Sequence, residues 1–507
     1  MPPNRRQPPL PDTGLDGEMF GGCYLSNNRA RFLKDYPAAL ADENGTIFIG
    51  AGVSMAAGYP SWARLLQEIG EELGVRSKDV ADLAALAQWS VSENGGAGRV
   101  RGVIRQQIGV VKPVPPALEV IARLPIKHLW TTNYDELIER AFQAINRPYD
   151  VISAAADLSI PRKPGAARIY KMHGSVTRLD DIVISTDDYE LYRTKRRPYL
   201  PLLEAHLTST SMLFVGLSFT DPNVRHVLSL IRESFTEAPP EHFAIVRPPH
   251  RDDYDTKDEF DARLAQHKLW AKDLRRYGLH AVEIDDYNEV PELLRLVERR
   301  VAMGRVWISG SWPPDDRDAL GAKVYTIAEG IGRAIGESGR ALVSGAGLLV
   351  GSASLSGFVE ALRAGGGWDL ERRLIARPFP QPREGDLQEC AKWTALREEM
   401  ARLSGIVVFL GGTKQQDGKL VDADGVIEEA DLARQAGAFL LPIGATGGAA
   451  KIIATRLRGS DILSTGPHSQ RPTDEELIAL SDKDLSAEQL IKLAITVMAR
   501  ASKELAA

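Results

Sequence analysis

From Thr46 onward, short apolar runs alternate with longer amphipathic stretches along the chain. Apolar runs of this length are typical of buried strands, and apolar residues at helical spacing, as over residues 61–73, are typical of helices packed on a sheet. A succession of strand, helix and strand predicts an α/β fold with a largely parallel sheet. The first part of the chain predicts a helix over 134–142 and strands over 46–50, 128–132, 168–172, 212–216, 242–246 and 280–284.

The same pattern returns after a charged helical stretch over residues 291–305. Here strands are predicted over 306–309, 341–344, 405–410 and 438–442, so we expect two doubly wound Rossmann-like domains without a shared repeat period. The expected division is an arm over residues 1–25, a domain over 26–300 and a second domain over 301–507. Near the C-terminal end, capping-box patterns predict two more helices, at Thr473 with Glu476 and at Ser486 with Gln489.

Composition narrows the functional class. The 507 residues carry 62 Lys and Arg against 68 Asp and Glu, a net charge of −6 without long single-sign blocks, which disfavours nonspecific binding to nucleic acids or membranes. Two cysteines, Cys23 and Cys390, predict neither a disulfide framework nor a cysteine-based metal site. The Pro-rich start predicts a mobile arm, and we expect a cytoplasmic protein without a secretory signal or a transmembrane helix.

The first predicted strand leads directly into a glycine-rich loop, Gly50-Ala51-Gly52-Val53-Ser54. Glycines let a backbone turn sharply and approach a phosphate group, and the N–H groups that open the following helix favour an anion. A tight strand-to-helix turn explains the loop equally well. The third glycine, Gly58, falls too late for the dehydrogenase fingerprint, and this spacing disfavours a hydride-transfer enzyme.

Three further polar segments follow predicted strands. They are Thr131-Thr132-Asn133-Tyr134-Asp135, Lys171-Met172-His173-Gly174-Ser175 and Gly216-Leu217-Ser218-Phe219-Thr220-Asp221-Pro222-Asn223. Open α/β sheets bind ligands beyond the carboxyl ends of their strands, where all three segments fall. Each also has a structural explanation by itself, since Asn133 and Asp135 suit helix caps and His173 suits a turn. Their joint occurrence favours a nucleotide site.

In this order, the four segments resemble the NAD site of the sirtuin (SIR2) family, over roughly residues 40 to 285. The resemblance implies that Asn133 and Asp135 hold the nicotinamide ribose side of NAD⁺ and that His173 is the general base near the ribose hydroxyls. It further implies contacts with the phosphates by Ala51, Gly52 and Ser54, and a second nucleotide contact by Gly216 and Ser218.

One departure from the sirtuin pattern bears on the reaction. Protein-deacylating sirtuins carry paired zinc cysteines after the His-Gly motif, whereas this chain has no cysteine between His173 and Gly216. Water is then the simplest acceptor of the ADP-ribosyl group, and Asn133 is suited to hold it. Histidine accepts protons near neutral pH. We therefore expect hydrolysis of NAD⁺ to nicotinamide and ADP-ribose, with Asn133 and His173 as catalytic residues and no metal.

The second half has glycine-rich turns of its own at strand ends, with Gly310 and Ser311 after one strand and Gly345 and Gly347 after another. This half resembles the SLOG superfamily of Rossmann-like domains, which includes the LOG phosphoribohydrolases. Leu410-Gly411-Gly412-Thr413-Lys414 lacks the G-T-x-x-E continuation of the LOG motif and reaches glutamates only after a polar loop over 415–425. We therefore expect nucleotide binding rather than catalysis.

A SIR2-like domain followed by a SLOG domain resembles the NAD-consuming effector family of the Thoeris anti-phage system. This resemblance implies a homotetramer or larger assembly, activated by a cyclic ADP-ribose isomer that a TIR-domain partner makes. The implied activator site comprises Arg397, Lys414 and Glu429, and whether Glu428 or Glu429 faces the ligand stays open. In this site we expect the arginine to contact the pyrophosphate bidentately, the lysine to add a point charge and the glutamate to accept ribose hydroxyls.

Three alternatives remain at this point. The first is an NAD-dependent protein deacylase or ADP-ribosyltransferase, which the missing zinc cysteines disfavour. The second is a regulator in which Asn133 and His173 hold NAD⁺ without cleaving it. The third is a LOG-like phosphoribohydrolase in the second half.

Overall fold

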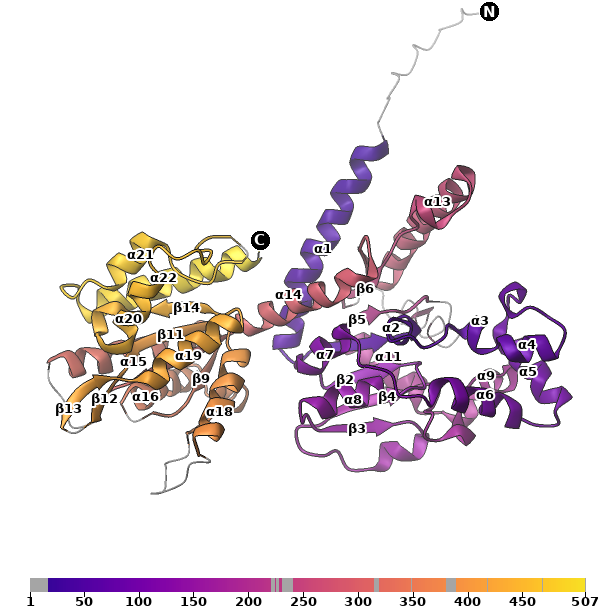
Figure 1. Ribbon diagram of the computed structural model, residues 1–507, viewed down its shortest axis with the longest axis horizontal. Coiled ribbons are helices and arrows are strands. Elements are labelled where there is room, and N and C mark those ends of the chain that lie inside the picture. Colours follow the sequence, from indigo (N-terminus) through magenta and orange to yellow (C-terminus); the bar gives the residue numbers. More distant parts are fainter. Residues whose placement is uncertain are drawn as a thin grey trace, which may run out of the picture. The chain divides into compact units, whose positions relative to one another are not determined.

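The computed structural model describes residues 17–219, 224, 228–229, 240–313, 319–347, 349–379, 389–416, 418–466 and 468–506 (Figure 1). The chain divides into two compact units, with the main boundary between Val290 and Pro291, a little before the expected Arg300. Each unit is a helix-covered parallel sheet. The prediction of two doubly wound α/β domains is thereby confirmed.

In the described part of unit 1, seven strands form one sheet in the order β3-β4-β2-β1-β5-β6-β7, and all neighbouring strands run parallel. Strands β2, β3 and β4 lie on one side of β1, and strands β5, β6 and β7 lie on its other side. The strand order therefore reverses at β1. The strands are β1 (Gly45–Ile49), β2 (His128–Thr131), β3 (Tyr149–Ile152), β4 (Ala167–Lys171), β5 (Ser211–Val215), β6 (His242–Val246) and β7 (Leu279–Glu283).

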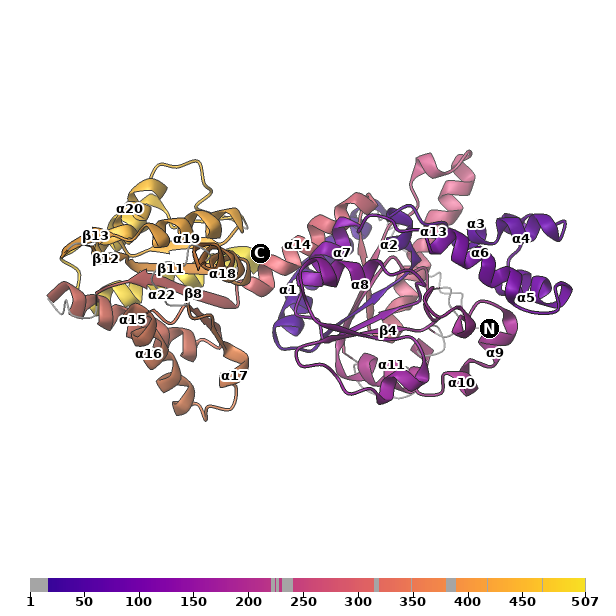
Figure 2. The same cartoon turned by 60° about the horizontal axis from the view of Figure 1, so that its bottom comes forward.

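Helices cover both faces of this sheet, and Figure 2 shows α8 and α11 on opposite sides of it. Alternate strand residues point to opposite faces, and Phe48, Trp130 and Phe214 pack in one buried cluster with Leu203 and Leu207 of α11. The helices described in this part are α1 (Gly17–Ala41), α2 (Ala51–Ala56), α3 (Trp62–Leu65), α4 (Gln67–Glu72), α5 (Leu83–Glu93), α6 (Gly98–Ile108), α7 (Pro116–Arg123), α8 (Leu137–Ala144), α9 (Thr186–Glu190), α10 (Tyr192–Lys195), α11 (Tyr199–Ser209) and α13 (Lys257–Leu274). Helix α14 (Val290–Ala302) begins at the boundary, and all of it after Val290 belongs to unit 2.

Several elements differ from the prediction. The helix expected over residues 61–73 is two short helices, α3 and α4, which part at Leu66 (φ −92°, ψ 10°). The helix expected from Tyr134 begins at Leu137, because the Asp135 carboxylate accepts the Leu137 amide (3.0 Å) and holds the preceding residues in a loop. Helix α1 includes residues 17–25 of the expected arm, and residues 1–16 lie outside the described chain.

In the described part of unit 2, a parallel five-stranded sheet has the order β10-β9-β8-β11-β14, and a separate antiparallel hairpin pairs β12 with β13. The strand order of the sheet reverses at β8. The strands are β8 (Arg305–Ser311), β9 (Ala341–Ser344), β10 (Leu374–Ala376), β11 (Ile406–Gly411), β12 (Thr413–Gln416), β13 (Lys419–Asp422) and β14 (Phe439–Pro442).

Two cores lie on the two faces of the unit 2 sheet. Val306 and Ile308 of β8 join the cluster formed with α15, α16 and α22, whereas Trp307 between them joins the cluster formed with α18, α19 and α20. Figure 2 shows α16 and α19 on opposite sides of the sheet. The helices described here are α15 (Ala319–Glu337), α16 (Val350–Ala364), α17 (Leu370–Arg373), α18 (Glu389–Leu403), α19 (Asp424–Gln435), α20 (Gly448–Leu457), α21 (Asp474–Leu480) and α22 (Ala487–Ala506).

Both predicted capping boxes are present. Thr473 Oγ1 accepts the Glu476 amide (3.2 Å) while the Glu476 carboxylate accepts the Thr473 amide (2.8 Å), which begins α21. Ser486 and Gln489 make the same reciprocal pair before α22. The prediction of a polar loop over residues 415–425 is wrong, because most of these residues belong to the hairpin β12–β13 and to the start of α19.

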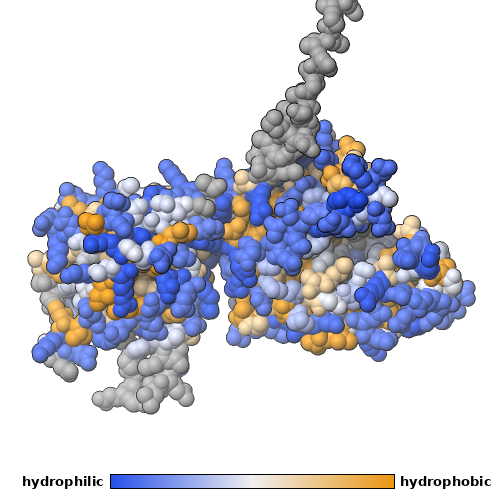
Figure 3. All heavy atoms as spheres, turned by 45° about the horizontal axis from the view of Figure 1, so that its top comes forward, coloured by the Kyte–Doolittle hydropathy of each residue, from blue (hydrophilic) through white to orange (hydrophobic). Residues whose placement is uncertain are grey.

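Hydrophilic residues cover most of the face seen in Figure 3, and hydrophobic ones occur there in small separate groups. None of the described helices is long and apolar enough to cross a membrane. Within the described ranges, no group of three or more His, Cys, Asp or Glu side chains is arranged to hold a metal ion.

Candidate nucleotide sites of the two units

The four sequence segments of unit 1 meet at one edge of its sheet. Lys171 of β4 pairs with Thr131 of β2, Thr131 with Ile49 of β1, and Ile49 with Val215 of β5. These residues form one row across four adjacent strands, so the residues that follow them emerge side by side at the carboxyl ends. This is the point of strand-order reversal, where open α/β sheets bind their ligands.

The glycine-rich loop and the Gly216 turn lie backbone against backbone. The Gly52 amide donates to the Gly216 carbonyl (2.9 Å), and a Cβ at Gly50 would stand 2.4 Å from the same oxygen. Gly216 has φ +68° and its own Cβ would meet the Val53 amide nitrogen at 2.8 Å. Only glycine fits these approaches. Close packing of the two loops therefore explains why Gly50, Gly52 and Gly216 are glycines. Ala51 and Gly52 are nevertheless exposed at the start of α2.

Ser54, Asn133 and Asp135 form a buried hydrogen-bond network. The Ser54 hydroxyl donates to Asp135 Oδ2 (2.5 Å), and Asn133 Nδ2 donates to Ser54 Oγ (2.8 Å) and to the Gly50 carbonyl (3.0 Å). All three polar side chains are less than 8% exposed, at 6%, 7% and 4% respectively. Ser54 thus joins Asn133 to Asp135, and the phosphate contact expected of its hydroxyl would compete with these bonds.

This network fixes which way the Asn133 amide points. The Gly50 carbonyl only accepts hydrogen bonds, so the side-chain atom of Asn133 that faces it must be Nδ2, which also donates to Ser54 Oγ. Asn133 Oδ1 consequently points the other way. That oxygen is buried and has no hydrogen-bond partner among the residues that the structure describes. A buried acceptor without a partner is energetically costly and marks a place for a ligand hydroxyl or a water.

His173 is buried, at 5% exposure, in the turn that follows β4. Its ring stands edge-on to Tyr189, with centroids 5.5 Å apart. The segments carrying His173 and Asn133 are joined by backbone hydrogen bonds from Met172 to the Thr131 carbonyl (2.8 Å) and from Val176 to the Tyr134 carbonyl (2.9 Å). The structure thus brings the two predicted catalytic residues onto adjoining loops.

A buried arginine, Arg196, holds the His173 turn. Its guanidinium donates to the carbonyls of Ser153 (2.7 Å) and Asp181, and the side chain is 2% exposed. Gly174 has φ +86°, and a Cβ there would lie 2.6 Å from the Asp181 carbonyl oxygen and 3.2 Å from Arg196 Nη2. The arginine belongs to none of the four sequence segments, and its sequence, Lys195-Arg196-Arg197, resembles a solvated charge run.

A buried ion pair beneath the network was not predicted from the sequence. Lys171 is fully buried, and its Nζ donates to Glu139 Oε1 (2.7 Å) and to the Asp135 carbonyl. Burial raises the pKa of Glu139, while the adjacent lysine opposes that shift. The sequence did offer a sign of this pair, since Lys171 directly follows the apolar residues Ile169 and Tyr170 and a charge in a buried strand requires a partner.

The last predicted segment is described only in part. Gly216 lies against the first loop, and Ser218 lies two residues further on with an exposed side chain. Thr220, Asp221, Pro222 and Asn223 lie outside the described residues.

In unit 2, the predicted activator residues also gather where the strand order reverses. Gly310 and Ser311 of β8 pair with Leu410 and Gly411 of β11. Beyond β9, a Cβ at Gly347 would lie 3.7 Å from the Gly310 carbonyl, and one at Gly345 would lie 2.6 Å from the Phe379 ring. The turns after β8, β9 and β11 therefore adjoin one another.

Arg397 of α18 lies beside these turns in contact with α19. Its Nη1 donates to Glu428 Oε2 (2.7 Å), its Nε donates to Glu429 Oε1 (3.3 Å), and its guanidinium carbon stands 5.5 Å from the centre of the Phe379 ring. Glu429 is buried and also accepts the Ser309 hydroxyl (2.6 Å), and burial raises its pKa. Glu428 is the more exposed of the two glutamates, at 40% of its side chain against 8%.

Lys414 approaches the same helix from the hairpin. Its Nζ lies 3.0 Å from Asp424 Oδ2, and the carbonyl of the preceding Thr413 accepts the Ser311 hydroxyl (3.0 Å). The structure therefore brings Arg397, Lys414 and Glu429 together around the start of α19.

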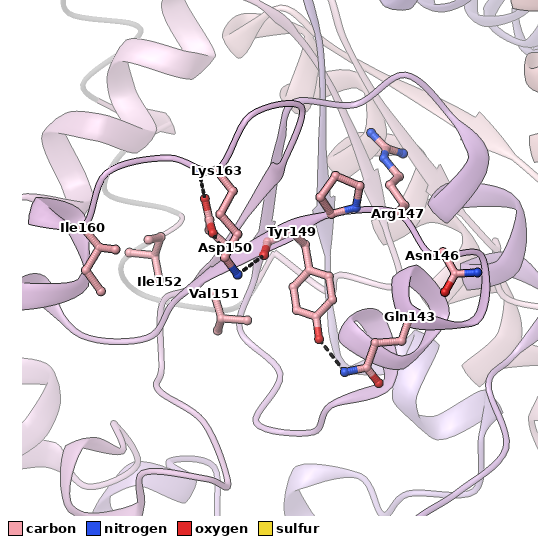
Figure 4. Close-up of a pocket in the computed structure, with 10 residues that line it drawn as sticks. Gln143, Asn146, Arg147, Tyr149, Asp150, Val151, Ile152, Ile160 and Lys163 are labelled. Carbon is pink, nitrogen blue, oxygen red and sulfur yellow. Dashed lines mark hydrogen bonds and ion pairs between the residues drawn. The ribbon is translucent and has the colours of Figure 1, made fainter. Parts of the chain in front are cut away.

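A separate cavity of about 730 Å³ lies beside edge strand β3 (Figure 4). Its polar side chains are largely satisfied, with Gln143 Nε2 2.6 Å from the Tyr149 hydroxyl and Lys163 Nζ 3.5 Å from Asp150. None of the predicted site residues lines this cavity, so it is separate from the nucleotide site of unit 1.

Comparison with known families agrees with the two-unit organisation. Residues 127–270 match the SIR2-like domain family, and residues 289–501 match the Sir2- and TIR-associating SLOG family.

Curated relatives span nearly the whole chain. NAD(+) hydrolase ThsA of Bacillus cereus (strain MSX-D12) is 33% identical over 471 residues, which cover 92% of this chain and 96% of the relative. The protein of the same name from Enterococcus faecium is 32% identical and covers 91% and 97%, and that from Acinetobacter baumannii (strain 532279) is 34% identical and covers 81% and 86%.

Proposed function

Since this chain belongs to the ThsA family of NAD(+) hydrolases, we propose that it is a signal-gated NAD⁺ glycohydrolase that depletes NAD⁺ in Thoeris anti-phage defence. Its reaction is the hydrolysis of NAD⁺ to ADP-ribose and nicotinamide. The proposal adds which residues carry that reaction and how it is switched on, with abortive infection as the outcome for the cell.

In the proposed mechanism, the bond between nicotinamide nitrogen and ribose C1′ breaks through an oxocarbenium-like state. A water oxygen forms the new bond to C1′, nicotinamide leaves with the electron pair of the broken bond, and the water loses one proton. Asn133 Oδ1 holds the water or a ribose hydroxyl, and His173 accepts the proton. A positioned general base contributes about 10²–10⁴-fold to a rate.

The free acceptor of Asn133 is the observation that carries this assignment. Its Oδ1 is buried, lacks a partner among the described residues and is held in one orientation by Ser54. It lies at the sheet edge where an open α/β fold receives a nucleotide. Asp135 supports the arrangement by accepting the Ser54 hydroxyl and the Leu137 amide.

The second unit is proposed to sense a cyclic ADP-ribose isomer made by a TIR-domain protein. The matched SLOG family is one that associates with Sir2 and TIR, which supports this source of the signal. Arg397 and Lys414 supply the positive charges for a pyrophosphate, and Glu429 holds Arg397 in place. The working assembly is a homotetramer or larger, and the activator must bind its active state more tightly than its inactive state.

The test is chromatography of NAD⁺ incubated with the purified protein, alone and with the products that a TIR-domain cyclase makes from NAD⁺. Nicotinamide and ADP-ribose should form only when those products are present, and should not form with His173→Ala. His468→Ala, which changes an exposed histidine, is the matched control and should behave like the unaltered protein. Equal turnover with and without the cyclase products would overturn the gating.

A further inference from the structure

Helix α19 places acidic side chains on both cations of the second site. Asp424 lies 3.0 Å from Lys414, and four residues later Glu428 lies 2.7 Å from Arg397. Residues at this spacing lie on the same side of a helix. The two positive charges that a pyrophosphate would need are therefore already paired with two carboxylates from one helix face.

The surroundings of Arg397 leave a phosphate little room beside Glu428. The side chain is 14% exposed, Phe379 covers one face of the guanidinium, and a Cβ at Gly425 would be 2.4 Å from Nη2. Glu429 occupies the inner side and is fixed by Ser309. Glu428 is the partner of Arg397 that stands toward solvent, where a phosphate would arrive.

We propose that Asp424 and Glu428 are internal substitutes for the activator's phosphates, which hold Lys414 and Arg397 until a pyrophosphate displaces them. This inference rests on the proposed function, since it concerns how the activator gains access to the same site. Carboxylates and phosphate oxygens both accept charge-assisted hydrogen bonds from arginine and lysine, so one can replace the other without leaving the cation unpaired.

The two glutamates then have different tasks. Glu429 is buried, bonded to both Ser309 and Arg397, and keeps its place as a support for the arginine. Glu428 is bonded to Arg397 and to Thr394 (3.0 Å), and at 40% side-chain exposure it is the more accessible of the two glutamates to an incoming phosphate. This assigns ligand access to Glu428, the question that the sequence alone left open.

Displacement of the two carboxylates by the activator's phosphates determines how much activator is needed to switch the enzyme on. The apparent dissociation constant equals the intrinsic constant divided by the fraction of molecules in which the binding residues are free. Each ion pair that occupies a cation lowers that fraction. Partly exposed pairs are worth at most about 1 kcal/mol, so removing one is expected to improve apparent affinity by up to about fivefold.

The experiment compares Glu428→Gln, Asp424→Asn and the double variant with the unaltered full-length protein. Asp431→Asn is the matched control, because Asp431 lies on the same helix with an exposed side chain. Calorimetry measures binding of inorganic pyrophosphate and of a chromatographically purified TIR-cyclase product. A parallel titration measures how much of that product gives half-maximal NAD⁺ hydrolysis.

We expect about three- to fivefold tighter binding and an equally lowered half-activating concentration for each single variant, a larger change for the double variant, and no change for Asp431→Asn. Weaker binding by Glu428→Gln would show that the carboxylate contacts the ligand, and unchanged binding would show that the pairs do not compete; either result overturns the inference. Failure of the proposed function is distinct, because the unaltered protein would then respond to no cyclase product.

Discussion

Asn133 illustrates how the neighbours of a single amide fix its orientation. Its Nδ2 is used by Ser54 and the Gly50 carbonyl, and only its Oδ1 remains for a ligand. The same asparagine in a helix cap would have used its oxygen on a backbone amide. Orientation, rather than residue type, therefore separates the functional explanation from the structural one at this position.

Ser54→Ala tests that orientation. Without the hydroxyl, Asn133 Nδ2 keeps only its bond to the Gly50 carbonyl and loses the link to Asp135, so the amide is held less firmly. We therefore expect NAD⁺ hydrolysis to fall by about tenfold, within the range of a lost positioning contact. The fall should appear in kcat more than in KM. Ser159→Ala, an exposed serine of the same unit, is the control and should leave both constants unchanged.

The buried pair Lys171–Glu139 gives a second prediction at this scale. Lys171→Met leaves Glu139 buried without a partner and should lower the free energy of unfolding by about 3–5 kcal/mol, whereas the double variant Lys171→Met/Glu139→Leu should recover most of it. Because both variants lose the hydrogen bond to the Asp135 carbonyl, both should have reduced kcat. Urea unfolding and initial rates separate the two effects; full activity in the double variant would show that the pair serves stability alone.

At the scale of elements, the turn after β4 depends on a left-handed glycine. Gly174→Ala introduces strain of about 1–3 kcal/mol and a methyl group 2.6 Å from the Asp181 carbonyl. We expect a lower melting temperature and weakened hydrolysis, because His173 is the preceding residue. Gly165→Ala is a matched control with a similar φ of +70° but with only Pro148 nearby, at 3.9 Å. It should lose stability through strain and retain activity.

The elements that the sequence predicted are those with an apolar signal. Strands such as β6 and β9 were located to the residue because their side chains are almost all buried. Strand β3, at the sheet edge, was missed because three of its four residues are half-buried, and the hairpin β12–β13 was missed because its strands are short and most of their residues are exposed. A hydrophobic pattern in the sequence indicates which residues are buried, and few residues of these strands are buried.

The residues of the candidate site in unit 1 also divide into those that a local sequence pattern predicted and those that it missed. Motifs at strand ends led to the prediction of Asn133, Asp135 and His173 as site residues, since ligands meet a parallel sheet there. Arg196 and Lys171 were not assigned roles, because their partners are backbone carbonyls and a glutamate on another element. Such contacts depend on tertiary structure and leave no local pattern.

At the scale of the whole molecule, one buried and three half-buried histidines predict sensitivity to acid. Burial lowers the pKa of His242, His206 and His280 to about 4 and that of His128, beside His206, to about 3. These rings stay neutral in the folded chain but take up protons in the unfolded chain below about pH 6.5. Folding stability should therefore be complete above pH 6.5 and decline as the pH falls toward 4.

For the fully buried His242, the loss is about 1.4 kcal/mol per pH unit below 6.5. Urea unfolding at pH 7.5 and pH 5.5 measures it. His242→Gln, which does not titrate, should lose about 1.4 kcal/mol less than the unaltered chain between these conditions. An identical pH dependence for both proteins would contradict the assignment.

The backbone contact between the first loop and the Gly216 turn also constrains how this enzyme can diversify. Gly50, Gly52 and Gly216 have no room for even one methyl group, so any side chain at these positions should force the two loops apart and lower folding stability. Ala51 and Met55 on the same helical turn are exposed and can change. Variants that bind a different nucleotide would therefore have to change exposed positions such as Ala51 and Met55, while the three glycines stay the same.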